Sequence, residues 1–159
     1  MKNLFKNVEI KQSNKMSKKD MKQLNKLNYV CLDLKLSYTQ VILKNRVKII
    51  KNNEGKTLYF EYFNKVYPTV ENFDRKLHKT VLLDEGALGP LNRGADVMMP
   101  GIIKYKDKIE EFEKDEIVGI EIETVGIFAV GKTLFSLKEM INKNSGVGIE
   151  VYNLKSDKI

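Results

Sequence analysis

The sequence is poor in the residues that build metal centres and disulfides, with one cysteine, one histidine and no tryptophan among 159 residues. A single cysteine, Cys31, excludes an intramolecular disulfide and a zinc site with several cysteine ligands. Because Cys31 lies in the apolar run at residues 29–32, we expect a buried structural thiol. The single histidine, His78, excludes a metal site built on several imidazoles. We expect His78 to be a satisfied residue at a domain junction, and we predict no metal site and no cofactor.

Long apolar runs are also lacking. No stretch approaches the about 20 apolar residues that cross a bilayer, and the first six residues lack the apolar segment of a secretion signal. We therefore expect a cytoplasmic protein that does not act at a membrane. The hydrophobic content of 42% and the charged content of 31% are typical of a globular chain, and the length suits one domain or two small ones.

Motifs that carry catalysis are missing as well. Residues 131–133 (Gly-Lys-Thr) match only the end of a phosphate-binding loop, and we interpret them as the end of a strand. Glu110, Glu111 and Glu113 cluster in a lysine-rich hydrophilic segment, where no apolar wall would raise a carboxyl pKa. The sequence contains no nucleophile elbow and no dinucleotide-binding fingerprint. It therefore predicts no catalytic residues and a protein that is not an enzyme.

Charge is distributed unevenly along the chain. Residues 1–77 contain 17 Lys and Arg against 7 Asp and Glu, a net charge of +10, whereas residues 78–159 contain 11 against 14, a net charge of −3. The two halves together give the overall charge of +7. A basic surface attracts polyanions, so the first half favours an RNA partner, although a solvated lysine-rich face would give the same count.

The first half of the sequence predicts a helix and several strands. Ser17, with Asp20 three residues later, is typical of a helix start, and the apolar spacing predicts a helix over residues 18–27. The alternation of Leu32, Leu34 and Leu36 predicts a strand there. Further strands are predicted at residues 8–12, 41–43, 47–50 and 58–62, with a hairpin turn at residues 52–55 and a short helix over residues 69–73.

Four aromatic residues gather near the end of this half: Tyr59, Tyr62, Phe63 and Tyr67. Aromatic rings stack on nucleic-acid bases when they are exposed. More often they pack in a core. We therefore assign most of them to the core.

The second half predicts a small mixed barrel covered by helices. Asp84 is placed to cap a short helix, Gly94 suits its left-handed end, and Ser136 opens a capping box. Strands are predicted at residues 79–83, 96–103, 117–122, 127–131 and 147–152, with a charged loop over residues 106–116. We place the boundary between the halves near residues 74–79.

Two stretches of the second half carry a family resemblance. Residues 83–87 (Leu-Asp-Glu-Gly-Ala) are followed by residues 93–102 (Arg-Gly-Ala-Asp-Val-Met-Met-Pro-Gly-Ile), and together they resemble the signature of the PUA domain. Later segments at residues 128–131, 136–140 and 146–149 fall where that domain places its last strands and helix. The resemblance covers about half of the chain.

With the Tyr67-Pro68-Thr69 junction and the basic region before it, the chain resembles the malignant T-cell amplified sequence family, the translation machinery-associated proteins of yeast. The length is more similar to archaeal members. The resemblance implies an α+β fold, with a mixed α/β pre-PUA domain at residues 1–76 packed on a PUA pseudo-barrel with short helices at residues 77–159. It implies a cytoplasmic RNA-binding factor that contacts small-subunit rRNA or tRNA in initiation or recycling, with a density-regulated-type protein partner.

The resemblance also implies which residues meet RNA. In PUA domains RNA commonly lies against the turn into the first helix, the loop after it and the following strand. The matching residues are Gly86, Ala87, Arg93, Gly94, Ala95, Met98, Pro100 and Gly101. Glycines allow close backbone approach, a helix start offers amides to phosphate, and Arg93 can pair with phosphate or stack on a base. Pro90 departs from the family pattern, and for Gly94 and Ala95 tight packing is an alternative explanation.

Two alternatives remain open at this point. PUA domains are often attached to pseudouridine synthases and transglycosylases, so the chain could assist RNA modification. A two-domain factor of large-subunit assembly has a similar build. The acidic-Gly-Ala and Gly-Ala-Asp-Val segments favour the translation factor.

Overall fold

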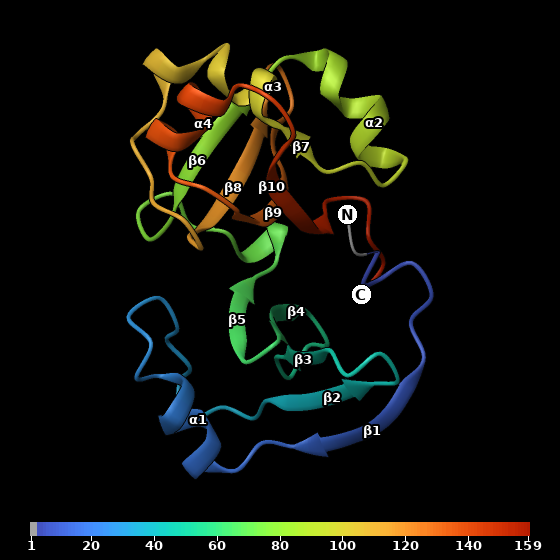
Figure 1. Cartoon of the computed structure of the whole chain (residues 1–159). Coiled ribbons are helices and arrows are strands. Elements are labelled where there is room, and N and C mark those ends of the chain that lie inside the picture. The colour runs from blue at the N-terminus through green and yellow to red at the C-terminus, as the bar shows by residue number, and fades with distance from the viewer. Residues whose placement is uncertain (1–2) are drawn as a thin grey trace. The chain divides into compact units, whose positions relative to one another are not determined.

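The computed structural model describes residues 3–159 and divides into two compact units. The N-terminal unit comprises residues 7–72, and the C-terminal unit comprises residues 3–6 together with residues 73–158. Each unit has a five-stranded sheet and few, short helices (Figure 1), so the α+β class predicted from the sequence is confirmed.

The N-terminal unit is a meander, because its strands are hydrogen-bonded antiparallel in chain order. Its elements are β1 (Ile10–Lys15), α1 (Lys18–Leu24), β2 (Thr39–Leu43), β3 (Lys48–Lys51), β4 (Thr57–Tyr62), β5 (Lys65–Pro68) and the 3-10 helix η1 (Val70–Asn72). Met21 of α1 packs into a core with Ile50, Tyr59 and Val66 from the sheet. Ser17 caps α1 by accepting the amide of Asp20, as predicted, but the helix ends three residues earlier than expected.

The strand predicted from Leu32, Leu34 and Leu36 is wrong. Residues 25–38 form a loop, in which the Asn25 side chain accepts the amide of Leu32 at 2.7 Å and donates to its carbonyl at 2.9 Å. This side chain satisfies the backbone groups that a neighbouring strand would otherwise have to pair. In the loop Leu32 is buried and Cys31 is exposed, so the prediction of a buried thiol is also wrong.

The hairpin turn predicted at residues 52–55 is present in the structure. Asn52 accepts the amides of Glu54 and Lys56 through its side chain, and Gly55 has a φ of +82°, which confirms the hairpin turn. Among the four aromatic residues, Tyr59 and Tyr67 are buried as expected, and the Tyr67 ring stacks on Phe60 at 5.2 Å. Phe63 is exposed.

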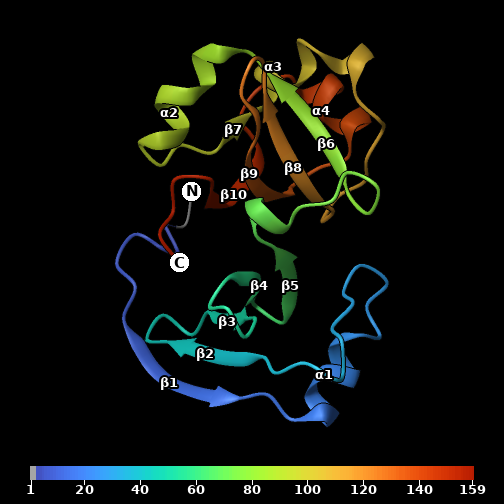
Figure 2. The same ribbon diagram turned by 180° about the vertical axis from the view of Figure 1, so that it is seen from behind.

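The C-terminal unit is a curled sheet in the order β6-β8-β9-β10-β7, parallel between β6 and β8 and antiparallel elsewhere. Its elements are β6 (Lys79–Leu83), η2 (Glu85–Ala87), α2 (Leu88–Asn92), β7 (Val97–Met98), α3 (Met99–Ile103), η3 (Lys106–Lys108), β8 (Ile117–Ile122), β9 (Gly126–Thr133), α4 (Leu137–Lys143) and β10 (Val147–Leu154). Figure 2 shows the strands curving around a shared interior, which is filled by apolar side chains of the sheet and of α3 and α4.

Most local predictions for this unit are confirmed. Asp84 accepts the amide of Gly86, Ser136 and Glu139 form the capping box, and Gly94 has a φ of +93°. The strand predicted over residues 96–103 is wrong beyond Met98, because α3 begins at Met99. Pro100 lies in the first turn of α3, where proline is tolerated since that turn needs no amide donor.

Candidate nucleic-acid interface

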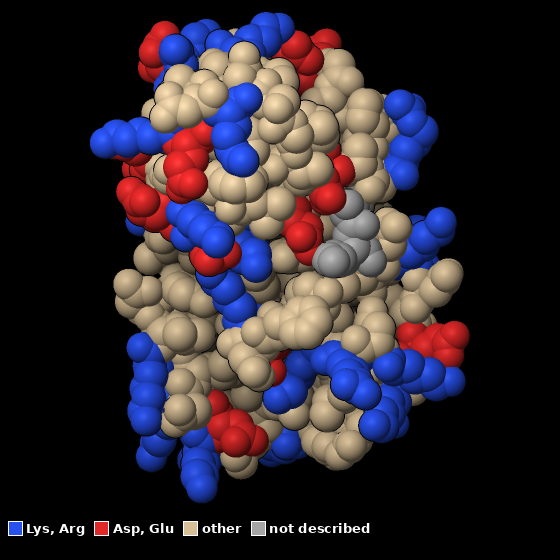
Figure 3. Space-filling view, in the orientation of Figure 1, with Lys and Arg blue, Asp and Glu red and all other residues tan. Residues whose placement is uncertain are grey.

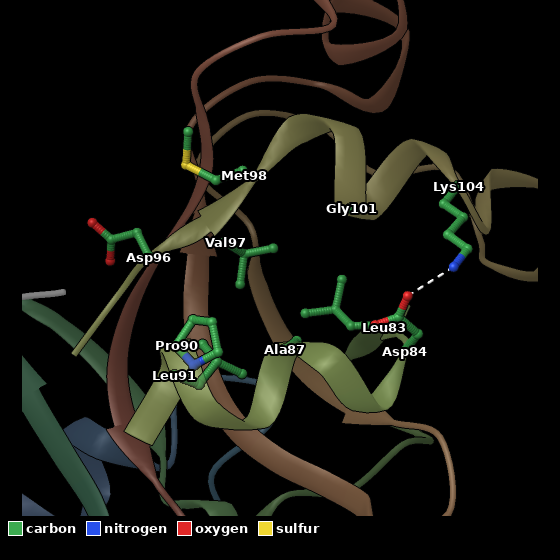
Figure 4. Close-up of a pocket in the computed structure, with 10 residues that line it drawn as sticks. All are labelled: Leu83, Asp84, Ala87, Pro90, Leu91, Asp96, Val97, Met98, Gly101 and Lys104. Carbon is green, nitrogen blue, oxygen red and sulfur yellow. Dashed lines mark hydrogen bonds and ion pairs between the residues drawn. The ribbon is translucent and has the colours of Figure 1, made fainter. Parts of the chain in front are cut away.

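A half-open cleft of about 250 Å³ lies in the C-terminal unit between the η2–α2 segment and the β7–α3 segment. Figure 4 shows Ala87, Pro90 and Leu91 on one wall and Val97 and Gly101 on the other, with Leu83 at the end of β6. Asp84, Asp96, Met98 and Lys104 complete the lining.

The chain forms this cleft by reversing direction sharply after α2. The amides of Gly94 and Ala95 donate to the carbonyls of Leu91 and Pro90, and the positive φ of Gly94 turns the backbone toward β7. The Asp96 carboxylate accepts the amide of Val151 at 3.0 Å, which attaches the start of β7 to β10. Hydrogen bonds to lining residues of both walls, Pro90, Leu91 and Asp96, therefore fix the backbone on the two sides of the cleft.

One end of the cleft carries an ion pair. The Lys104 ammonium donates to Asp84 at 2.7 Å, and the other oxygen of Asp84 accepts the amide of Gly86 at 2.9 Å. The hydrogen bond from Lys104 is the main cause that holds the pKa of Asp84 below its usual value, and the same bond raises the pKa of Lys104. The ammonium also lies 5.4 Å from the centre of the Tyr105 ring, within cation–π range. Both groups are thus charged at neutral pH.

The cleft has two kinds of surface. Its middle is apolar, its end is charged, and its volume is below the roughly 300–1,000 Å³ of typical sites for drug-sized ligands. RNA-binding proteins recognise unstacked bases by stacking and by hydrogen bonds to their edges. At the rim, the Lys104 ammonium can donate to a base edge or to a phosphate, whereas the Asp84 carboxylate can only accept from a base edge.

The residues predicted from the sequence are divided among several places. Ala87, Met98 and Gly101 line the cleft. Arg93 and Gly94 instead line a second cavity of about 180 Å³, together with Asn3, Lys6, Asn92, Leu154, Ser156 and Asp157. Gly86, Ala95 and Pro100 line neither of these two cavities, although Gly86 and Pro100 are exposed.

The helix start after Asp84 is less available to phosphate than we expected. The amide of Gly86 donates to the Asp84 side chain, and the amide of Ala87 donates to the Asp84 carbonyl. Both donors are therefore used within the chain. A phosphate at this position would have to rely on side chains such as Lys104.

Arg93 lies at the end of α2 and is exposed to solvent. Its guanidinium leans over Gly89, where an added Cβ would be 3.1 Å from Nη1. Asp157 also lines this cavity; burial raises its pKa, and its carboxylate accepts the amide of Leu154 at 2.7 Å. The cavity is therefore lined by a solvent-exposed cation, Arg93, and by a carboxylate that is hydrogen-bonded to the backbone, Asp157.

Sequence reasoning missed most of the cleft. In the sequence Pro90 is only a departure from the family pattern, and no motif marks Lys104 as a binding residue. The ion pair of Lys104 with Asp84 spans 20 residues, so no local pattern reveals it. The apolar members Leu83, Leu91 and Val97 look like ordinary core residues in the sequence, and they are indeed buried.

Two further features concern the whole described chain. Within residues 3–159, histidine, cysteine and acidic residues form no group of three or more that could hold a metal ion. In the same residues no helix combines the length and the apolar character needed to cross a membrane.

Comparisons with known proteins show which proteins this chain is similar to. A family model described as "elF2D, PUA domain" matches residues 83–158. The chain is 30% identical over 134 residues to the malignant T-cell-amplified sequence 1 homolog of Drosophila melanogaster and, likewise, to translation machinery-associated protein 20 of Schizosaccharomyces pombe. Each alignment covers 79% of this chain and 71% of the relative.

Other matches differ in how much of the chain they cover. A hypothetical protein of Pyrococcus horikoshii has a crystal structure similar to this one, with a TM-score of 0.69, 26% identity, and coverage of 92% of this chain and 96% of that one. A probable tRNA pseudouridine synthase B of Nanoarchaeum equitans is 32% identical over 91 residues, which are 57% of this chain and only 25% of the enzyme.

Proposed function

This chain belongs to the family of malignant T-cell-amplified sequence and translation machinery-associated proteins, and we propose that it is a non-enzymatic RNA-binding factor of the translation machinery. In this proposal the chain contacts small-subunit rRNA or tRNA during initiation or recycling, in the cytoplasm. A density-regulated-type protein is the proposed protein partner.

The cleft between η2–α2 and β7–α3 is the observation that carries the proposal. Its apolar walls suit one unstacked base, and the Lys104–Asp84 pair at its rim suits polar atoms of a nucleotide. Ala87, Met98 and Gly101 contribute to the cleft. We propose that Gly86, Arg93, Gly94, Ala95 and Pro100 flank the path of the RNA outside it.

The charge of the N-terminal unit supports the same proposal. Residues 7–72 contain 13 Lys and Arg against 6 Asp and Glu, a net charge of +7. Figure 3 shows these cations spread over the visible face of this unit, whereas acidic and basic side chains are mixed on the C-terminal unit. Attraction of phosphates to such a surface is independent of sequence and weakens as salt rises. We infer that the N-terminal unit attracts the phosphates of RNA independently of sequence. The cleft then binds a single unstacked base.

The two alternatives are weaker. An auxiliary role in RNA modification draws on the match to a pseudouridine synthase, but that match covers 57% of this chain, against 79% for the translation-associated relatives. A role in ribosome assembly requires binding to the large subunit. The family relatives are matched over 79% of the chain, that is, over more than its PUA domain, which favours the translation role.

Co-sedimentation with separated small and large ribosomal subunits, over a series of salt concentrations, tests the proposal. We expect binding to the small subunit that weakens as salt rises. Exclusive binding to the large subunit would favour assembly, and binding to neither subunit together with tight binding to free tRNA would favour modification.

A pair of variants at Gly101 links this experiment to the cleft. Gly101→Met places a flexible apolar side chain in the cleft, and we expect it to weaken binding. Gly101→Ala is the matched control, because the added Cβ would meet only Leu83 Cδ2, at an ordinary 3.7 Å. If both variants and the natural chain bind equally, the cleft is not part of the RNA interface.

A further inference from the structure

The hairpin between β4 and β5 ends in a two-residue turn, Phe63-Asn64, that breaks the usual rules for such turns. Tyr62 and Lys65 are the last paired residues, and the two residues between them have φ values of +48° and +61°. These angles are typical of a type I′ turn, which strongly prefers Asn-Gly or Asp-Gly. Here phenylalanine occupies the first position.

Phenylalanine is unfavourable at this position for two independent reasons. A positive φ is strained for a bulky side chain, at a cost of the order of 1 kcal/mol or more. The ring also gains little from burial, because Phe63 remains 84% exposed. Stability therefore does not explain why this residue is present. Departures from local rules of this kind are expected at functional sites.

The neighbouring ring orients Phe63. Tyr62 lies 4.5 Å away, centroid to centroid, at an interplanar angle of 67°, which is an edge-to-face contact. Such a contact favours one orientation of the ring. Together with the exposed fraction, it leaves most of the Phe63 ring open to solvent.

The charge of the N-terminal unit favours RNA over an apolar protein partner. Lys65 is the register partner of Tyr62, and Lys48 lies on β3 beside Glu61 of β4, 3.4 Å from its carboxylate. The whole N-terminal unit carries a net charge of +7. Single-stranded RNA is commonly bound by aromatic rings that stack on bases within a basic surface.

We propose that Phe63 is a stacking platform for an unpaired RNA base, at a second contact in the N-terminal unit besides the PUA cleft. This inference rests on the proposed RNA-binding function and assigns a part of it to the hairpin tip. The contact takes any base, since every base has a π face, and it adds affinity without neutralising a phosphate.

Three variants of the full chain test the inference. Phe63→Asn replaces the ring by a residue that type I′ turns prefer. Phe63→Tyr retains a ring. Leu36→Asn is the matched control, since it changes another exposed apolar residue of the same unit, 48% exposed, to the same residue. The probes are a labelled oligoadenylate of about 15 nucleotides and an abasic oligoribonucleotide of equal length, with binding measured by fluorescence anisotropy over a salt series.

We expect Phe63→Asn to weaken binding to oligoadenylate by about 5- to 100-fold, with the salt slope unchanged and the melting temperature equal or higher. Phe63→Tyr and Leu36→Asn should bind as the natural chain does, and the abasic probe should bind all four chains equally. Equal affinity of Phe63→Asn and the natural chain for oligoadenylate would overturn the inference. So would failure of the natural chain to bind oligoadenylate while it still co-sediments with ribosomal subunits, a result that leaves the proposed function standing. Failure in both assays would overturn both.

Discussion

The Lys104 ammonium lies 2.7 Å from the Asp84 carboxylate, and this ion pair joins the end of β6 to the end of α3 at the rim of the cleft. Both side chains are partly exposed to solvent, Lys104 by 57% and Asp84 by 43%. Such a pair contributes little to stability, so its two charges remain available for other uses. Asp84 therefore neutralises Lys104, a cation at the rim of the proposed RNA-binding cleft.

Substitutions at the two ends of this pair should therefore change RNA affinity in opposite directions. Asp84→Asn keeps an oxygen for the amide of Gly86 but frees Lys104, so we expect tighter binding and a steeper salt dependence. Lys104→Gln removes the cation, so we expect weaker binding and a salt slope reduced by about one. Titration with labelled RNA at several salt concentrations measures both effects, and changes of the same sign would contradict the assignment.

Arg93 should act through its charge outside the cleft. We expect Arg93→Ala to weaken RNA binding and to reduce the salt slope by about one, while Arg93→Lys keeps much of the affinity. Lys138→Ala is the control, because Lys138 is an exposed cation of α4 that lies in the same unit and faces Glu111 at 3.5 Å. If Arg93→Ala binds RNA as tightly as the natural chain at every salt concentration, the surface around Arg93 does not contact RNA.

Helix caps and turns, which depend on residues close together in the chain, could be predicted from the sequence. Ser17, Asp84 and Ser136 each accept a backbone amide two or three residues ahead, so the signal and the contact lie in one short window. The turn at residues 52–55 depends likewise on Asn52 and on a glycine with positive φ. Patterns of this kind need no knowledge of the tertiary fold.

Contacts between distant residues could not be predicted in this way. Asn25 satisfies the backbone of Leu32 across a loop, and that contact replaces the strand that alternating leucines suggested. The loop leaves Cys31 exposed although its sequence neighbours are apolar. The cleft has the same origin, since Lys104 meets Asp84 only after α3 has folded back onto the end of β6. Seven of its ten lining residues were not among those predicted to bind RNA.

His78 should make stability depend on pH. Burial lowers its pKa, an effect that nearby Asp74 opposes, and the Phe73 ring lies 5.6 Å away. An unfolded histidine has a pKa of about 6.5, so below that value the unfolded chain binds a proton that the folded chain resists. We expect the melting temperature to fall as the pH decreases from about 7.5 through 6.5 and below, and the fall to be smaller in His78→Gln.

Asp157 also makes stability depend on pH, but it does so equally in the natural chain and in His78→Gln. Burial raises its pKa, so its contribution to stability has the opposite sign, falling as the pH rises through the carboxyl range. Both chains contain Asp157, and the difference between their melting curves therefore isolates His78. Parallel curves for the natural chain and His78→Gln would contradict the prediction.

A substitution at Gly131 tests whether the Gly-Lys-Thr segment at residues 131–133 is the end of a strand and not part of a phosphate-binding loop. It lies within β9, opposite Val151 of β10, and an added Cβ would collide with the Glu150 carbonyl and lie 2.9 Å from Ile149 Cγ2. Because a backbone carbonyl in a sheet cannot move aside cheaply, we expect Gly131→Ala to lower the free energy of unfolding by about 1–3 kcal/mol. Gly101→Ala is the control and should be neutral or slightly stabilising, since it adds a methyl group to a helix without a clash. Chemical denaturation measures both, and a Gly131→Ala chain as stable as the natural one would show that the strands can separate at this point without loss of packing.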